Sequence, residues 1–154
     1  YQREPSEEQR NLAQWLISQG VDHIIGSHPH VIQPIARIPH TEYPTQHAVV
    51  YSLGNLISNQ NDRYTDTTAA VQMTLSLDPA TGEATVSDVA YQPIWRLRRD
   101  KTADEVYALL DAHRELAAYE AGTGTITQSQ AESLYRCIDD CRAILGESWT
   151  NKIS

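Results

Sequence analysis

The stretch that decides the fold reads Gln19-Gly20-Val21-Asp22-His23-Ile24-Ile25-Gly26-Ser27-His28-Pro29-His30-Val31. Gly20 is typical of the residue that follows the end of a helix. Residues 21–25 contain two adjacent isoleucines and should form a short buried strand. Two histidines follow just beyond the carboxyl end of that strand. Because open α/β sheets bind their ligands at this edge, the sequence predicts a functional site there.

Regular elements are expected on both sides of this stretch. Ser6 and Gln9 form a capping box, which predicts a helix that begins there and ends before Gly20. The sheet on which this helix packs should contain strands near residues 21–25, 34–38 and 48–53.

A β-hairpin is the next expected element. Residues 69–77 alternate apolar and polar side chains, and the segment 78–82 has the composition of a turn. The chain can then return along residues 85–92. We expect this hairpin to extend the small sheet, which makes the fold class α/β.

Two helices should close the chain. Thr102 and Glu105 form a second capping box, and apolar residues at helical spacing follow as far as Ala117. A last helix should begin at Thr127 or Ser129 and end at Gly146.

Composition limits the function. The chain has 154 residues, of which 40% are hydrophobic and 21% charged, so it can bury a core. Its net charge of −8 argues against a nucleic-acid partner and against an anionic membrane surface. No segment approaches the roughly 18 apolar residues of a membrane span. Because the chain starts at Tyr1 and its only methionine is Met73, we expect it to be a piece of a longer protein.

His28 and His30 are candidate metal ligands. Pro29 fixes its own φ and favours an extended His28, and residues two apart in extended backbone point to the same side. The spacing would therefore present two imidazoles together. Neutral imidazole suits zinc, iron, manganese or nickel. The alternative is two polar histidines in a solvated loop.

The arrangement of a strand, a glycine and two histidines one residue apart resembles the G-H-x-H element of calcineurin-like metallophosphoesterases. A closer likeness is to the C-terminal half of the CapA-like capsule-synthesis family, bacterial proteins associated with poly-γ-glutamate capsules. The likeness covers roughly residues 1 to 95. It rests on Glu4-Pro5 followed by Glu8-Gln9, on the residues from Gly20 to Ile35, and on Tyr51-Ser52-Leu53-Gly54-Asn55-Leu56-Ile57.

The resemblance implies a partial metallophosphoesterase-like sheet with flanking helices, formed by residues 1–97, and a helical tail, residues 98–154. It also implies that His28 and His30 bind divalent metal ions (Mn, Zn or Fe) in a two-metal centre. Such a centre takes its other ligands from an N-terminal half: an Asp and a His near the first strand, a further Asp and an Asn-His pair. This sequence lacks those elements, so we expect the chain to be inactive alone.

Partners and localisation follow from the same resemblance. The missing N-terminal half should cover part of the sheet, so we expect an exposed apolar patch or edge on this chain. A second copy of the chain could cover it instead. The family implies a location in the cell envelope or outside the cytoplasm.

Ser52 and Asn55 are candidate substrate-site residues, since they lie in the family-like turn Tyr-Ser-Leu-Gly-Asn. The alternative is that Asn55 caps the turn and Ser52 satisfies backbone groups. His23 is interpreted as a packed or surface strand residue, not as a ligand, and His47 as a solvated histidine beside a polar loop.

Two other clusters have functional and structural interpretations. Cys137 and Cys141 are four apart in a predicted helix, with β-carbons about 5–6 Å apart. A disulfide wants about 3.8 Å, which favours free, partly buried thiols over a disulfide or a zinc half-site. The basic cluster from Arg96 to Lys101 could bind an anionic polymer, or it could be a solvated linker.

Two hypotheses for function result. In the first, the chain is a fragment of a metal-dependent hydrolase or accessory protein of poly-γ-glutamate capsule biosynthesis. In the second, it is a non-catalytic polymer-binding or assembly module of the same fold.

Overall fold

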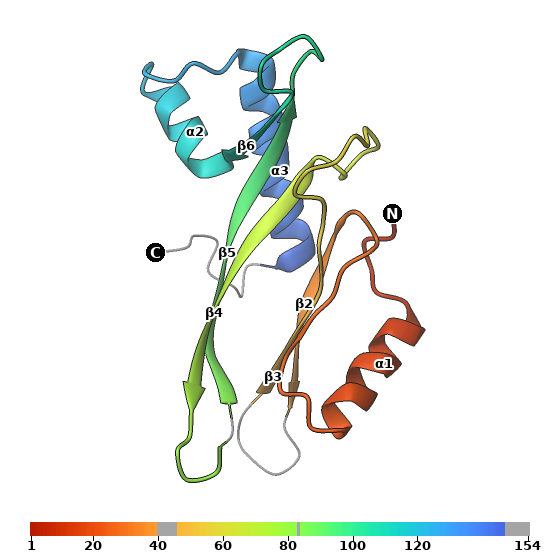
Figure 1. Cartoon of the computed structure of the whole chain (residues 1–154). Helices are drawn as coiled ribbons and strands as arrows, with labels where there is room; N and C mark the ends of the chain where they lie inside the picture. The colour runs from red at the N-terminus through yellow and green to blue at the C-terminus, as the bar shows by residue number, and fades with distance from the viewer. Residues whose placement is uncertain (40–45, 83, 147–154) are drawn as a thin grey trace.

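The computed structural model describes residues 1–39, 46–82 and 84–146. Figure 1 shows a long, twisted hairpin with one helix along it and a smaller sheet with a second helix beside it. The elements in chain order are α1 Glu7–Ser18, β1 Ile24–Ile25, β2 Ile32–Pro39, β3 Gln46–Leu53, β4 Thr67–Leu77, β5 Ala84–Arg98, β6 Tyr107–Asp111, α2 Ala112–Glu120 and α3 Gln128–Leu145.

The predicted capping box of α1 is confirmed. The Ser6 hydroxyl accepts a hydrogen bond from the Gln9 backbone N–H at 3.2 Å, and the Gln9 side chain accepts from the Ser6 N–H at 2.8 Å. The helix ends at Gln19, and Gly20 follows with a φ of +92°. Both helix ends are therefore determined by local sequence.

The first sheet has the strand order β1-β3-β2. β1 runs parallel to β3, with Ile24 opposite Val49, and β2 runs antiparallel to it, with Ile35 opposite Val50. The strand expected over residues 21–25 is shorter, because only Ile24 and Ile25 pair with β3. β3 is the buried centre of this sheet, with both valines fully buried.

The hairpin was expected to extend this sheet, and that prediction is wrong. β4 and β5 form a second sheet with β6, in the order β4-β5-β6. Within the described parts of the chain, a single isolated bridge between Gly54 and Thr68 joins the edges of the two sheets. Gly54 has a φ of +78°, which turns the chain out of β3 before a longer ladder can form. The α/β class holds, with two small sheets instead of one extended sheet.

The helix predicted from Thr102 to Ala117 is also wrong in its first half. Residues 107–111 form β6, in which Leu110 pairs with Trp95 of β5. The Asp111 side chain accepts from the Arg114 backbone N–H at 3.0 Å, so α2 begins only at Ala112. The last helix agrees with its prediction, since Thr127 caps α3 and Gly146 follows it.

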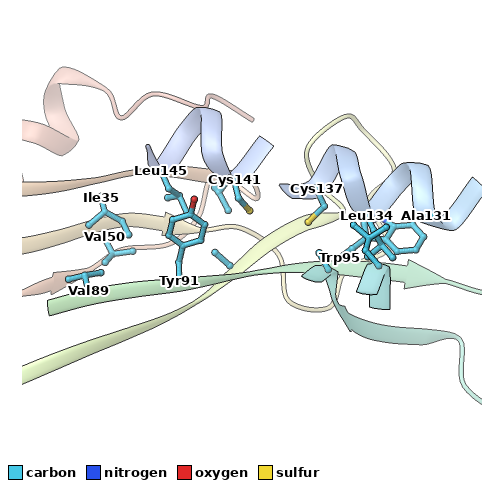
Figure 2. Packing of buried hydrophobic residues seen from close by; sticks show 14 residues of the cluster. Ile35, Val50, Val89, Tyr91, Trp95, Ala131, Leu134, Cys137, Cys141 and Leu145 are labelled. Atoms are coloured by element: carbon cyan, nitrogen blue, oxygen red, sulfur yellow. The ribbon is translucent and has the colours of Figure 1, made fainter. Parts of the chain in front are cut away.

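The core lies between α3 and both sheets. α3 contacts β2, β4 and β5, and one apolar cluster joins all of these elements. Figure 2 shows Leu134, Cys137 and Cys141 on α3 directed toward Tyr91 and Trp95 of β5. The C-terminal helices are thus packed against the sheets, although the boundary drawn at residue 97 stays a prediction.

Both cysteines are free thiols and fully buried, at 1% and 0% exposure. A hydrogen bond with Cys137, together with burial, raises the pKa of Cys141, so its thiol is neutral at physiological pH. These residues are packing groups of the core.

Apolar side chains are exposed at α1 and β1. Leu12 and Trp15 of α1 are more than half exposed, and so is Ile25 of β1. A groove of about 190 Å³ lies between these elements and is lined by Leu12, Leu16 and Ile24, among others. The exposed apolar surface agrees with the expectation for this sheet, and what covers it stays a prediction.

No helix in the described ranges is long and apolar enough to cross a membrane.

Candidate functional site

His28 and His30 lie in the turn that connects β1 to β2, and both side chains are exposed to solvent. They line a cleft of about 590 Å³ together with Tyr1, Gln9, Ser27 and Gln33, among others. The cleft joins the start of the chain, the first turn of α1 and the carboxyl end of β1. This is the sheet edge at which the sequence predicted a site.

The backbone of this turn differs from the prediction. His28 has a φ of +111° and His30 a φ of +63°, so neither residue has the extended conformation that was expected. Residues other than glycine rarely adopt such φ angles. Each residue that does so lowers the stability of the folded state by on the order of 1–3 kcal/mol. Strained residues of this kind concentrate at binding and catalytic sites. The turn therefore stores strain at the two candidate ligands.

The two imidazoles nevertheless lie close together. Their ring centroids are 6.1 Å apart and their planes are tilted by 43°. Because a metal–imidazole bond is about 2.1 Å long, two rings bound to one tetrahedral metal have centroids about 5 Å apart. The two rings lie farther apart than this, so their exposed side chains must move closer together before both can bind one ion.

Asn55 holds His30 in one orientation. The Nδ1 atom of His30 lies 2.9 Å from the Oδ1 atom of Asn55. Asn55 Nδ2 donates to Gln60 Oε1 at 2.7 Å, and Gln60 Nε2 donates to the Tyr1 hydroxyl at 2.9 Å. Because the Asn55 amide nitrogen donates to Gln60, its Oδ1 atom is the acceptor on the side of His30. His30 Nδ1 therefore carries the proton. The lone pair of His30 Nε2 is then directed away from Asn55 and is suited to bind a metal.

Ser52 has a different environment. Its side chain is 1% exposed, and its hydroxyl accepts from the Gly54 backbone N–H at 3.2 Å. Ser52 therefore stabilises the turn that precedes Asn55, and it does not line the cleft. The structure brings Asn55 and His30 into contact, whereas Ser52 contacts neither the cleft nor, by its hydroxyl bond, either of these residues.

The two histidines fit part of a metal site. In residues 1–39, 46–82 and 84–146, no group of three or more His, Cys, Asp or Glu side chains is placed to hold a metal ion. Two imidazoles supply two ligands, whereas a catalytic zinc site uses three protein ligands and a water. The pair thus suits one side of a metal centre, with no reaction step assigned to this chain alone.

Three residues of the site were not singled out from the sequence. Gln60 and Tyr1 belong to the hydrogen-bond chain that ends at His30. Gln33 is buried, and its Nε2 atom donates to the backbone oxygens of Gln2 and Glu4 at 2.9 and 3.2 Å. It fixes the first residues of the chain beside the cleft. The sequence signal that could have identified Gln33 is the presence of a glutamine in the otherwise apolar start of β2.

Two further histidines lie together away from the cleft. The His47 Nδ1 atom is 2.7 Å from the Asp22 backbone oxygen, and the His23 Nδ1 atom accepts from the Ala48 N–H at 3.2 Å. Burial lowers the pKa of His23. His23 is half-buried and lies just before β1, outside the strand in which it was expected, whereas His47 is buried and not solvated.

Replacing Asn55 with leucine is expected to release the His30 tautomer. Leucine keeps the approximate size of the side chain but cannot accept a hydrogen bond from the Nδ1–H group, so both tautomers of His30 become populated. Imidazole ¹⁵N chemical shifts measure this, and His28 serves as the internal control because it is not bonded to Asn55. Unchanged His30 shifts in the variant would contradict the assignment.

Comparison with known proteins gives a consistent assignment for the first part of the chain. Residues 1–60 match the family described as Bacterial capsule synthesis protein PGA_cap. The chain is 38% identical over 72 residues to "PGA biosynthesis protein CapA" of Bacillus subtilis (strain 168) and 36% identical over 72 residues to "Capsule biosynthesis protein CapA" of Bacillus anthracis. Each match covers 47% of this chain, but only 17% and 16% of the relatives' own lengths. No solved structure matches the chain. By sequence, the N-terminal part of this chain resembles the CapA-like capsule-synthesis proteins.

Proposed function

We propose that this chain supplies His28 and His30 to the metal centre of a metal-dependent hydrolase or accessory protein of poly-γ-glutamate capsule biosynthesis. The observation that carries the proposal is the contact between His30 Nδ1 and Asn55, which leaves Nε2 for a metal beside the ring of His28. The similarity to two CapA proteins named for PGA or capsule biosynthesis supports the biological process. The calcineurin-like fold is part of the proposal and rests on the resemblance.

The proposed cofactor is a divalent Mn, Zn or Fe ion, a set that rests on the family resemblance. Neutral imidazole is a suitable ligand for zinc and iron, and such an ion would polarise a substrate oxygen and activate a water. The carboxylates and imidazoles that complete the centre would come from a segment outside this chain. On this proposal the chain alone binds metal weakly and is inactive.

The exposed surface at α1 and β1 suggests where that segment would pack. Leu12, Trp15 and Ile25 remain exposed beside an apolar groove, and burying them would stabilise a complex. The partner proposed is the N-terminal half of the same domain, with a second copy of the chain as the other candidate. A cell-envelope or extracytoplasmic location belongs to the same proposal.

A non-catalytic module is the second candidate function. It is favoured by the presence of only two clustered ligands among the described residues. A module of this kind would bind or assemble an anionic polymer without cleaving it.

Calorimetric titration with manganese and with zinc tests the ligand assignment. Weak binding is expected for the chain, and His28→Ala or His30→Ala should each lower the affinity by about tenfold to a hundredfold. His113→Gln is the control, because it removes a histidine from α2, outside the cleft. Binding that is absent, or equal in all variants, would remove the metal assignment and leave the second candidate.

A further inference from the structure

The structure points to a second binding site, for a small oxyanion, at the carboxyl end of β5. A pocket of about 330 Å³ lies there, between β5, the loop before β4 and the first turns of α3. We call it the Arg96 pocket. The residues of the lining that carry the argument are Asn61, Asp66, Arg96, Arg98, Ser129 and Ser133. We infer that it binds a carboxylate group, independently of the proposed metal centre.

The buried guanidinium of Arg96 is the first observation. The side chain is 3% exposed, and only its Nη2 atom has a hydrogen-bond acceptor, the Gln60 backbone oxygen at 2.7 Å. Its Nε and Nη1 atoms are buried without a partner. The ring of Tyr107 lies 5.9 Å from Cζ, and no carboxylate forms an ion pair with Arg96 within the described ranges.

Such an arrangement is costly without an anion. A buried charge needs both an opposite charge and hydrogen-bond partners, and the folded state is destabilised when these are missing. The two unpartnered donors of Arg96 thus indicate a missing acceptor. Arg96 lines the pocket, but both donors are themselves covered, so an anion that enters the pocket must displace a covering group to reach them.

The surrounding groups complete a site for negative charge. Arg98 is held by the same loop, with Nη1 at 3.0 Å from Asn61 Oδ1 and 3.4 Å from the Asn59 backbone oxygen. α3 is 18 residues long and begins at this pocket, so the positive end of its dipole adds to the field. The hydroxyls of Ser129 and Ser133 lie on its first two turns.

Asp66 selects among anions. It also lines the pocket, and its Oδ2 atom accepts from the Trp95 indole N–H at 3.0 Å. A carboxylate in the pocket repels phosphate, whose charge of about −2 is concentrated on one group, more than one end of glutarate, whose second carboxylate stays in solvent. The net charge of −8 adds no long-range attraction, so binding must come from these local donors.

The proposed anion site involves only part of the basic cluster from Arg96 to Lys101 that the sequence indicated. Arg99 does not line the pocket, and its guanidinium is bonded to Glu105 at 3.2 Å. Two arginines, not the whole cluster, therefore face the pocket. Arg99 is also a matched control, because its neutralisation changes the net charge by the same amount as that of Arg98.

Titration with sodium glutarate and with inorganic phosphate, at constant ionic strength, tests the inference by ¹H–¹⁵N NMR. Glutarate should give saturable shifts at the Arg96 Nε–H and at the amides of residues 129–133. Arg98→Gln should weaken this binding by about tenfold, the usual effect of losing one charged hydrogen-bond donor. Arg99→Gln should change it by less than about twofold, as expected for an exposed charge.

Arg96→Met removes the buried charge and keeps much of the side-chain volume. Binding should be lost, and the midpoint of thermal unfolding should not fall, because an apolar replacement of an unpaired buried charge is neutral or stabilising. If this variant does not fold, the comparison of Arg98→Gln with Arg99→Gln still decides whether glutarate binds in the Arg96 pocket.

Three results would overturn the inference. They are an absence of saturable shifts at millimolar glutarate, equal weakening by Arg98→Gln and Arg99→Gln, and tighter binding of phosphate than of glutarate. His28→Ala should leave glutarate binding unchanged, so failure of the metal assignment and failure of this site are separate outcomes.

Discussion

Replacing Leu134 with alanine is expected to lower the free energy of unfolding by about 3 kcal/mol. Leu134 lies on α3, is fully buried, and packs with Trp95 of β5 in the cluster drawn in Figure 2. Truncation removes its contacts and leaves a cavity that the surrounding strands can fill only in part. Urea denaturation followed by circular dichroism measures the loss.

The matched control is Leu75→Ala on β4. Leu75 is 56% exposed, so the same chemical change should cost less than about 1 kcal/mol. Equal losses for the two variants would mean that α3 is not part of the cooperative core. A large loss at Leu134 alone would establish that the C-terminal helices and the sheets unfold together.

Arg63→Ala is expected to lower the free energy of unfolding by about 2–3 kcal/mol. Removing one partner of a fully buried ion pair costs more, roughly 3–5 kcal/mol. Arg63 makes a two-point ion pair with Asp140 of α3, with Nη2 at 2.6 Å from Oδ1. The carboxylate side chain is only 11% exposed, whereas that of Arg63 is 45% exposed. Hydrogen bonding to Asp140 raises the pKa of Arg63. Removing the arginine leaves a buried charge without a partner.

The reverse truncation, Asp140→Ala, should cost only about 1 kcal/mol, because water can hydrate the half-exposed guanidinium that remains. Asp139→Ala on the same helix is the control: its side chain is 75% exposed and its ion pair with Arg142 measures 3.9 Å, so the change should be within about 0.5 kcal/mol. Thermal and urea unfolding give all three values. A larger cost for Asp140→Ala than for Arg63→Ala would contradict this explanation.

The starts of α1 and α3 were predictable because their signals are local, whereas the same kind of signal at Thr102 and Glu105 is not followed by a helix. Ser6 with Gln9, and Thr127 with a glutamine three residues later, each determine a helix start within one turn. The segment 107–111 was not predictable in this way. Its apolar residues satisfy a helical period and a strand alternation equally well, and the choice is made by pairing with β5, which lies about a dozen residues earlier.

The proximity of His28 and His30 was predictable from the sequence, but the geometry of their turn was not. The sequence indicates His28 and His30 as a pair, and the structure places their rings 6.1 Å apart. The contacts that orient His30 come from Asn55 and Gln60, and the last of them reaches Tyr1 across 59 positions. The hydrophobic periodicity of a sequence does not indicate side-chain hydrogen bonds between residues so far apart. The positive φ of His28 was also unforeseen, since Pro29 favours extended backbone before it.

The left-handed backbone at these two histidines has a consequence for engineering. Glycine adopts such φ angles without steric cost, so His28→Gly and His30→Gly would relieve strain in the folded chain. A selection scheme that rewards thermostability alone would therefore favour these two exchanges and discard both imidazoles. On the proposed metal assignment, stability and metal binding therefore compete in this turn, and a stabilised library of this protein should be assayed for zinc and manganese binding at every round.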